Sequence, residues 1–77
     1  MPEYDRSVVE TAFAQNGFNK VQEDDGIAIY QKNIYPGYEI VVDWFASERI
    51  EWADLQRYLE DADIPHQPIR DSLDKKN

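Results

Sequence analysis

The octet YEIVVDWF, residues 38–45, constrains the fold of this chain more than any other segment. Its side chains alternate with a period of two, which is the pattern of a β-strand with one buried face. The residues predicted to face a core are Tyr38, Ile40, Val42 and Trp44. The residues predicted to face away are Glu39, Val41, Asp43 and Phe45. The rest of the chain must therefore supply partner strands and a layer that covers one side of a sheet.

A helix is predicted over about residues 7–16. Ser7 and Glu10 have the spacing of a capping box, in which each side chain bonds the backbone of the other. The helix has a short apolar face made of Val8, Val9, Ala12 and Phe13. Gly17 is expected to end it in the left-handed conformation, with Phe18 packing back on the last turn.

Residues 18–32 are predicted to form a β-hairpin. Its turn is the sequence DDG, in which Gly26 supplies the positive φ that a tight hairpin requires. Pro36 and Gly37 occupy the central positions of a second turn, of type II, which leads into the strand at 38–45.

A second helix is predicted over residues 47–64, with either Ser47 or Asp54 as its N-cap. A buried stripe at helical spacing runs along it, and Pro65 is expected to end it. The stripe consists of Trp52, Leu55, Leu59 and Ala62, with Tyr58 beside it.

These elements predict one α+β domain over residues 1–66 and a polar C-terminal tail over 67–77. In that tail, Ile69 and Leu73 either dock a final half-turn or remain mobile. The predicted architecture is a two-layer sandwich in the order α-β-β-β-α. Its three-stranded antiparallel sheet has both helices on one face and leaves the other face open.

The chain has 77 residues and no cysteine, so we expect stability to come from packing alone. A hydrophobic share of 42% is too high for a disordered segment. The N-terminus lacks the apolar core of a signal peptide, and no run approaches the roughly 20 apolar residues of a membrane span. We expect a soluble, cytoplasmic protein.

Charge restricts the partners. Sixteen acidic and eight basic residues give a net charge of -8, which repels phosphate backbones and anionic membranes. The only adjacent basic residues, Lys75 and Lys76, lie in the predicted tail. Direct binding of nucleic acid or membrane is therefore not expected.

Three segments resemble the HicA/YcfA family of small toxin mRNA interferases, which share the topology of double-stranded-RNA-binding domains. They are VVETAFAQNGF, GIAIYQK and LQRYLEDADI, and the resemblance spans about residues 7–64. In the last segment, the residues that fall on the family's apolar pattern are Leu55, Leu59, Ala62 and Ile64. The resemblance implies the α+β scaffold predicted above.

The resemblance does not extend to the family's catalytic residues. Gly26 matches the glycine of the family's Gly-Ser-His segment, but Ile27 and Ala28 stand where the serine and the RNA-cleaving histidine would be. An alanine methyl group cannot transfer a proton. The resemblance therefore implies a shared scaffold without the catalysis.

No other segment predicts an enzyme, a cofactor or a metal. His66 is the only histidine and lies between two prolines, with no evident partner to orient it. Residues 23–25 are three consecutive acids, but the apolar residues that follow do not continue a calcium loop.

The open face of the sheet is the predicted site of partner binding. We expect Tyr30 and Ala28 to lie there beside strand 38–45, with Lys20 and Lys32 nearby, and aromatic residues rimmed by charge are typical of interfaces. The predicted binding residues are Glu39, Asp43, Tyr30, Phe45 and Val41, with Asp24 and Asp25 at the hairpin tip and Glu48 and Glu51 at the start of the second helix.

The sequence therefore favours a non-enzymatic acidic module that inhibits or regulates a nucleic-acid-handling protein, because carboxylates can occupy a groove built for phosphates. In composition it is similar to phage-encoded anti-CRISPR proteins and to immunity proteins against nucleases. Two alternatives stay open. One is a divergent HicA-like domain that binds RNA without cleaving it, and the other is a homodimeric accessory domain.

Overall fold

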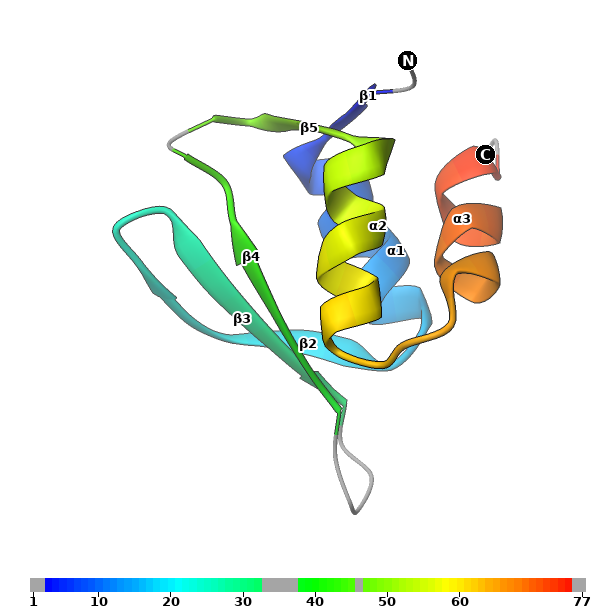
Figure 1. Ribbon diagram of the computed structural model, residues 1–77, viewed down its shortest axis with the longest axis horizontal. Helices are drawn as coiled ribbons and strands as arrows, with labels where there is room; N and C mark the ends of the chain where they lie inside the picture. Colours follow the sequence, from blue (N-terminus) through cyan, green and yellow to red (C-terminus); the bar gives the residue numbers. More distant parts are fainter. Residues whose placement is uncertain (1–2, 33–37, 46, 76–77) are drawn as a thin grey trace.

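The computed structural model describes residues 3–32, 38–45 and 47–75 of the chain. Three helices lie on one side of a three-stranded antiparallel sheet, so the predicted α+β class is confirmed (Figure 1). The elements, in chain order, are β1 (Glu3–Asp5), α1 (Arg6–Gln15), β2 (Phe18–Asp24), β3 (Ile27–Lys32), β4 (Glu39–Asp43), β5 (Arg49–Glu51), α2 (Trp52–Asp61) and α3 (His66–Asp74).

The predicted glycine turns are present. Strands β2 and β3 form a hairpin whose two turn residues, Asp25 and Gly26, have φ of 53° and 82°, as a type I′ turn requires. Gly17 ends α1 with φ of 88°, a conformation that glycine adopts without strain. The predicted turn at Pro36 and Gly37 lies outside the described residues.

The predicted capping box of α1 is wrong. The helix begins at Arg6, with Asp5 as an N-cap whose side chain makes no capping bond. Ser7 and Glu10 therefore lie inside the helix, where their side chains cannot cap its first turn. The Glu10 carboxylate instead accepts a hydrogen bond of 2.7 Å from the Tyr30 hydroxyl.

The predicted start of the second helix is also wrong. Residues 49–51 form strand β5, which pairs antiparallel with β1, and α2 begins only at Trp52. Neither Ser47 nor Asp54 is its N-cap. The strand forms because a distant segment supplies a partner: the Arg49 Nε lies 2.7 Å from Glu3 Oε1, across the pair.

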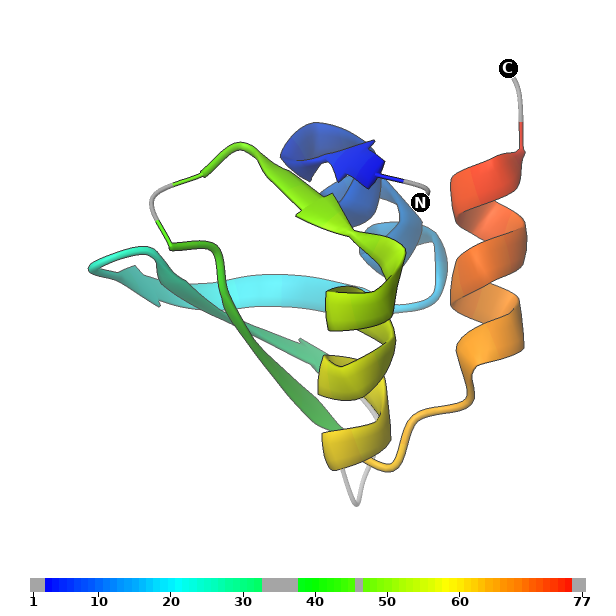
Figure 2. The same cartoon turned by 45° about the horizontal axis from the view of Figure 1, so that its top comes forward.

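Helix α3 forms where the sequence predicted a polar tail. Helices α1 and α2 cover the sheet, and α3 packs on both of them from outside, farther from the strands (Figure 2). Ile69 and Leu73 lie one turn apart on α3 and are both buried in the core. The helix therefore belongs to the domain through Asp74. In the part of the chain that the structure describes, no helix is long and apolar enough to cross a membrane.

One hydrophobic core lies between the sheet and the helices. The predicted stripe of α2 is confirmed: Leu55 and Leu59 are fully buried, and the partly buried members of the stripe pack against the core. The core-facing residues of β4 and its end are also as predicted, with Tyr38 as the exception. Tyr38 is 44% exposed, because it precedes the first residue of β4 and lies at the rim of a surface groove.

Candidate partner-binding surface

Strand β3 turns Tyr30, its one aromatic residue, toward the helices, opposite to the prediction. Ala28 pairs with Val42 and Tyr30 pairs with Ile40, and all four are buried. Tyr30 and Ala28 therefore do not lie on the open face. The strand has apolar residues on both sides, and the edge-on contact of the Tyr30 ring with Phe13, at 4.8 Å between centroids, helps to hold Tyr30 inward.

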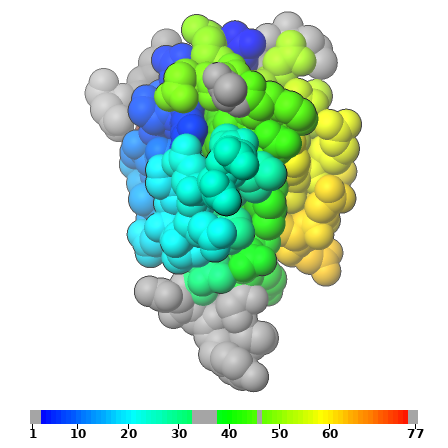
Figure 3. Space-filling view, turned by 90° about the vertical axis from the view of Figure 1, so that its left-hand side faces the viewer, coloured from blue at the N-terminus to red at the C-terminus, as the bar shows by residue number. Residues whose placement is uncertain are grey.

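We call the side of the sheet that faces away from the helices the open face. Figure 3 looks onto it, with β2, β3 and β4 across the front and the helices at or behind its margins. Pairing and alternation assign to it Asn19, Val21, Gln22, Asp24, Ile27, Ile29, Gln31, Glu39, Val41 and Asp43, and Phe45 follows just past the end of β4.

The strand register sets most of these residues in three rows that cross the sheet. Neighbours within a row lie about 5 Å apart, so the two outer members are about 10 Å apart. From the hairpin end, the rows are Asp24–Ile27–Asp43, Gln22–Ile29–Val41 and Asn19–Gln31–Glu39. A row with an isoleucine between two aspartates is thus followed by a row in which Ile29 and Val41 are apolar, and then by a polar row.

The apolar part of the open face is well exposed. Ile27 is 40% exposed, Val41 45% and Val21, the extra residue of a β-bulge in β2, 54%. Ile29 lies between Ile27 and Val41 in the pairing pattern, so these residues form a continuous patch. A continuous apolar patch on a small domain favours contact with another molecule.

The charge on this face is of one sign. Asp24, Asp43 and Glu39 lie at its ends, and no lysine or arginine lies on the open face of the described strands. Lys20 and Lys32, which were expected nearby, turn to the helix side. The Lys20 ammonium makes ion pairs there, and the Lys32 ammonium lies 5.7 Å from the centre of the Phe18 ring.

Phe45 is the most unusual residue beside this surface. Its side chain is 78% exposed, and its φ of 51° is in the left-handed region, which costs an L-residue about 1–2 kcal/mol. The turn is fixed on both sides. The Asp43 carboxylate accepts a hydrogen bond of 2.9 Å from the Phe45 N–H, and the Trp44 N–H donates to the Gly26 carbonyl at 2.8 Å. Backbone strain that presents an exposed aromatic side chain is a feature of binding sites.

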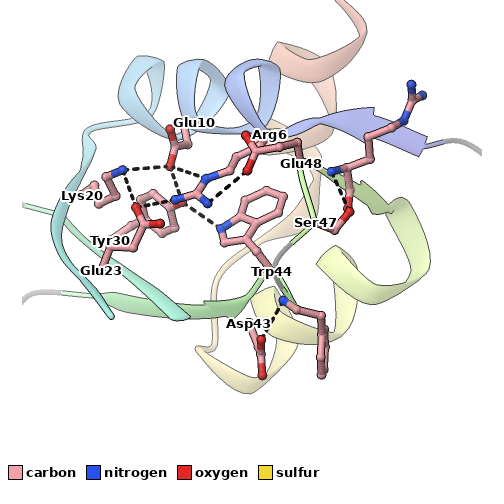
Figure 4. A network of polar contacts seen from close by, with 11 residues as sticks. Arg6, Glu10, Lys20, Glu23, Tyr30, Asp43, Trp44, Ser47 and Glu48 are labelled. Atoms are coloured by element: carbon pink, nitrogen blue, oxygen red, sulfur yellow. Dashed lines mark hydrogen bonds and ion pairs between the residues drawn. The ribbon is translucent and has the colours of Figure 1, made fainter. Parts of the chain in front are cut away.

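An ionic network on the helix side of the sheet surrounds Trp44 and so supports the end of β4 next to Phe45 (Figure 4). The Arg6 guanidinium lies over the Trp44 indole at 5.2 Å and contacts the carboxylates of Glu10 and Glu23. Lys20 completes the cluster, with its ammonium 2.8 Å from Glu23. Hydrogen bonds from Arg6 and then from Lys20 lower the pKa of Glu23 to about 2.

Tyr30 connects this network to the core. Its hydroxyl accepts a hydrogen bond of 3.2 Å from the Trp44 indole N–H and donates one of 2.7 Å to Glu10. Burial, and then the Glu10 carboxylate, raise the pKa of the Tyr30 phenol. Every buried side-chain nitrogen and oxygen of the described residues has a partner. Asp43 extends to the opposite side of the strand from Trp44 in Figure 4, so the network backs the surface without covering it.

Besides Tyr30, which faces the core, three predicted binding residues lie apart from the rows of the open face. Asp25 occupies the hairpin turn at its end. Glu51 lies in β5, opposite Glu3 in the two-stranded sheet. Glu48 precedes β5, and its carboxylate lies 3.6 Å from the Arg6 guanidinium. The remaining predicted residues, Asp24, Glu39, Val41, Asp43 and Phe45, do lie on or beside the open face.

The sequence missed the contributions of Ile27 and Ile29 to this face and of the Arg6 network to its support. The available signal for the network was the four-residue spacing of Arg6 and Glu10 on one helix, which places an ion pair on its surface. No sequence signal placed the two isoleucines on the open face, because both sides of β3 are apolar enough to be buried.

The groups with the potential for acid–base chemistry lie elsewhere. His66 Nδ1 is 3.3 Å from the Gln56 amide nitrogen, and His66 Nε2 is 3.6 Å from the Glu60 carboxylate. Among the residues that the structure describes, no group of three acidic or histidine side chains is placed to hold a metal. Ala28, which the predicted resemblance sets at the position of the HicA/YcfA histidine, is fully buried in the core.

No protein-family model, curated protein or solved structure matches this chain. The resemblance to the HicA/YcfA family therefore stays a prediction.

Proposed function

We propose that this chain is a non-enzymatic protein-binding module that contacts its partner through the open face and Phe45. The observation that carries this proposal is the position of Phe45, whose large apolar ring is 78% exposed to solvent on a residue with positive φ. The fold gains little from a ring in that position and bears the cost of its backbone conformation. A contact with another molecule would bury the ring and offset that cost.

The partner that fits this surface combines an apolar pocket with basic side chains around it. The pocket would take Phe45 and the patch formed by Ile27 and Val41, and the cations would face Asp24 and Asp43 on either side. Proteins that handle nucleic acids carry basic grooves for phosphates, which these carboxylates can occupy through the same attraction. We therefore propose that the module inhibits or regulates such a protein.

The same charges disfavour the two alternatives. In a homodimer formed through the open face, the acidic ends of the rows would meet carboxylates of the second copy and no basic residue of the described strands. RNA bound to this face would bring its phosphates against the same carboxylates. Neither alternative has a specific observation in its favour.

The test is affinity capture from the lysate of the source organism, followed by titration of the purified partner. Glu39→Lys with Asp43→Lys reverses two charges of the open face. Asp61→Lys with Asp71→Lys, on exposed sites of α2 and α3, is the matched control with the same net charge. We expect the first pair to weaken binding about tenfold or more, because attraction becomes repulsion and the Asp43 hydrogen bond that holds the Phe45 turn is lost, and the control pair to leave binding nearly unchanged.

Recovery of a partner whose affinity is equal for both pairs of variants would contradict the assignment of the open face. Recovery of only further copies of this chain would contradict the proposed partner class and favour a self-associating accessory domain.

A further inference from the structure

A second surface feature lies on the helix side of the sheet, away from the open face. It is a groove of about 220 Å³ where the end of α1, the start of β2, the end of β3 and the start of α3 meet. Its lining consists of Asn16, Phe18, Lys32, Tyr38, Ile64, Pro65, Pro68 and Ile69.

Hydrogen bonds fix the walls of this groove. The Lys32 N–H donates to the Tyr38 carbonyl at 3.0 Å, which sets the two residues side by side at the end of the sheet. The Asn16 side-chain amide donates to the Ser72 hydroxyl at 3.0 Å and so ties α1 to α3. The Ile64 N–H bonds back to the end of α2 at 2.9 Å. The groove is thus largely formed before any ligand arrives, as small-molecule sites usually are.

The charge of the groove is opposite to that of the protein. The chain has 16 acidic residues, but among the described residues no acidic side chain lines the groove and Lys32 is the only charged one that does. Within the described residues, Lys32 makes no ion pair. Its aliphatic stem passes over Gly17, where an added Cβ would lie only 3.3 Å from Lys32 Cε. The Lys32 ammonium lies 5.7 Å from the centre of the Phe18 ring, and both residues line the groove.

We propose that this groove binds a ligand with one carboxylate and a compact apolar body. Lys32 would pair with the carboxylate, and the apolar walls, including both prolines, would cover the body. The net charge of -8 repels multiply charged anions such as phosphates, whereas a monoanion with an apolar body loses less to that repulsion. Such a ligand is either a free small acid or the C-terminal carboxylate of a polypeptide. This site is separate from the open face and does not depend on the function proposed for it.

The test is a titration of the protein with 4-phenylbutyrate, followed by amide chemical shifts in NMR spectra. We expect saturable shifts for Phe18, Lys32, Ile64 and Ile69, and weaker binding of the neutral analogue 4-phenylbutan-1-ol. Lys32→Met should weaken phenylbutyrate about fivefold, as a partly exposed ion pair allows. Lys75→Met removes a lysine outside the groove and is the matched control, expected to bind as the wild type does.

A second arm distinguishes the two sources of the carboxylate. A short peptide ending in phenylalanine is titrated with a free and with an amidated C-terminus. Tighter binding of the free peptide than of phenylbutyrate assigns the site to polypeptide C-termini, and the reverse assigns it to small acids; both support the proposal. It is overturned if neither acid gives saturable shifts in the groove up to about 10 mM, a weak limit even for small ligands. Equal affinities for the acid and the alcohol, or for the wild type and Lys32→Met, overturn it as well.

Discussion

Replacement of Phe45 by glycine should make the folded protein more stable. At φ of 51° an L-residue bears a cost of about 1–2 kcal/mol, which glycine does not. Glycine loses about 0.5–1 kcal/mol through the greater entropy of the unfolded chain. With the ring 78% exposed, little buried contact is lost. The expected net gain in the free energy of unfolding is about 0.5–1 kcal/mol.

Two further variants separate backbone from side chain. Phe45→Ala removes the ring and keeps the strained backbone, so its free energy of unfolding should stay within about 0.5 kcal/mol of the wild type. Val41→Gly removes an exposed side chain from an ordinary strand position, where glycine should destabilise by about 0.5–1 kcal/mol.

The assay is urea denaturation followed by the fluorescence of the two tryptophans, with thermal unfolding as a check. For a domain of this size, the gain expected for Phe45→Gly corresponds to a rise of about 2–8 °C in Tm. If Phe45→Gly instead destabilised the protein as much as Val41→Gly, the ring would stabilise the fold and would not be kept for binding.

Three other changes test the core and the network. Tyr30→Phe leaves the Glu10 carboxylate and the Trp44 N–H without their shared partner and should cost about 1–3 kcal/mol in urea denaturation; an unchanged stability would mean that water replaces the hydroxyl. The pKa of Glu23 falls from 4.5 to about 2 on folding. The contribution of its carboxylate to the free energy of unfolding is therefore complete above pH 4.5 and is lost as the pH falls toward 2, so Glu23→Gln should make stability fall less steeply in acid. An equally steep fall would refute that role. Ile69→Ala should destabilise by about 2–5 kcal/mol, whereas a neutral effect would show that α3 is dispensable.

Local chemistry made part of the fold predictable. Gly17 and Gly26 end a helix and form a hairpin turn through their own conformational freedom, so the residues themselves carry the information. The apolar stripe of α2 and the alternation of β4 were likewise readable, because each has one apolar side and one polar side. For the same reason, Val41, Asp43 and Phe45 were placed correctly on the outer side of their strand.

The remainder depended on partners that are distant in the sequence. Strand β5 has a helical pattern and becomes a strand because β1 pairs with it. Strand β3 has two apolar sides, and only contacts with α1 and β4 decide that Tyr30 faces inward. Helix α3 was too short and too polar to be predicted, and it is held by Ile69 and Leu73 in a core that other elements build.

The most direct test of the central claim is the affinity of the captured partner for the wild type and for Phe45→Gly, measured by calorimetry. If Phe45 is kept for binding, the variant should be at least as stable as the wild type and yet bind about 30-fold or more weakly, the loss expected for a central aromatic residue of an interface. Affinities within about twofold of each other would contradict the account, because the exposed ring would then have no part in recognition.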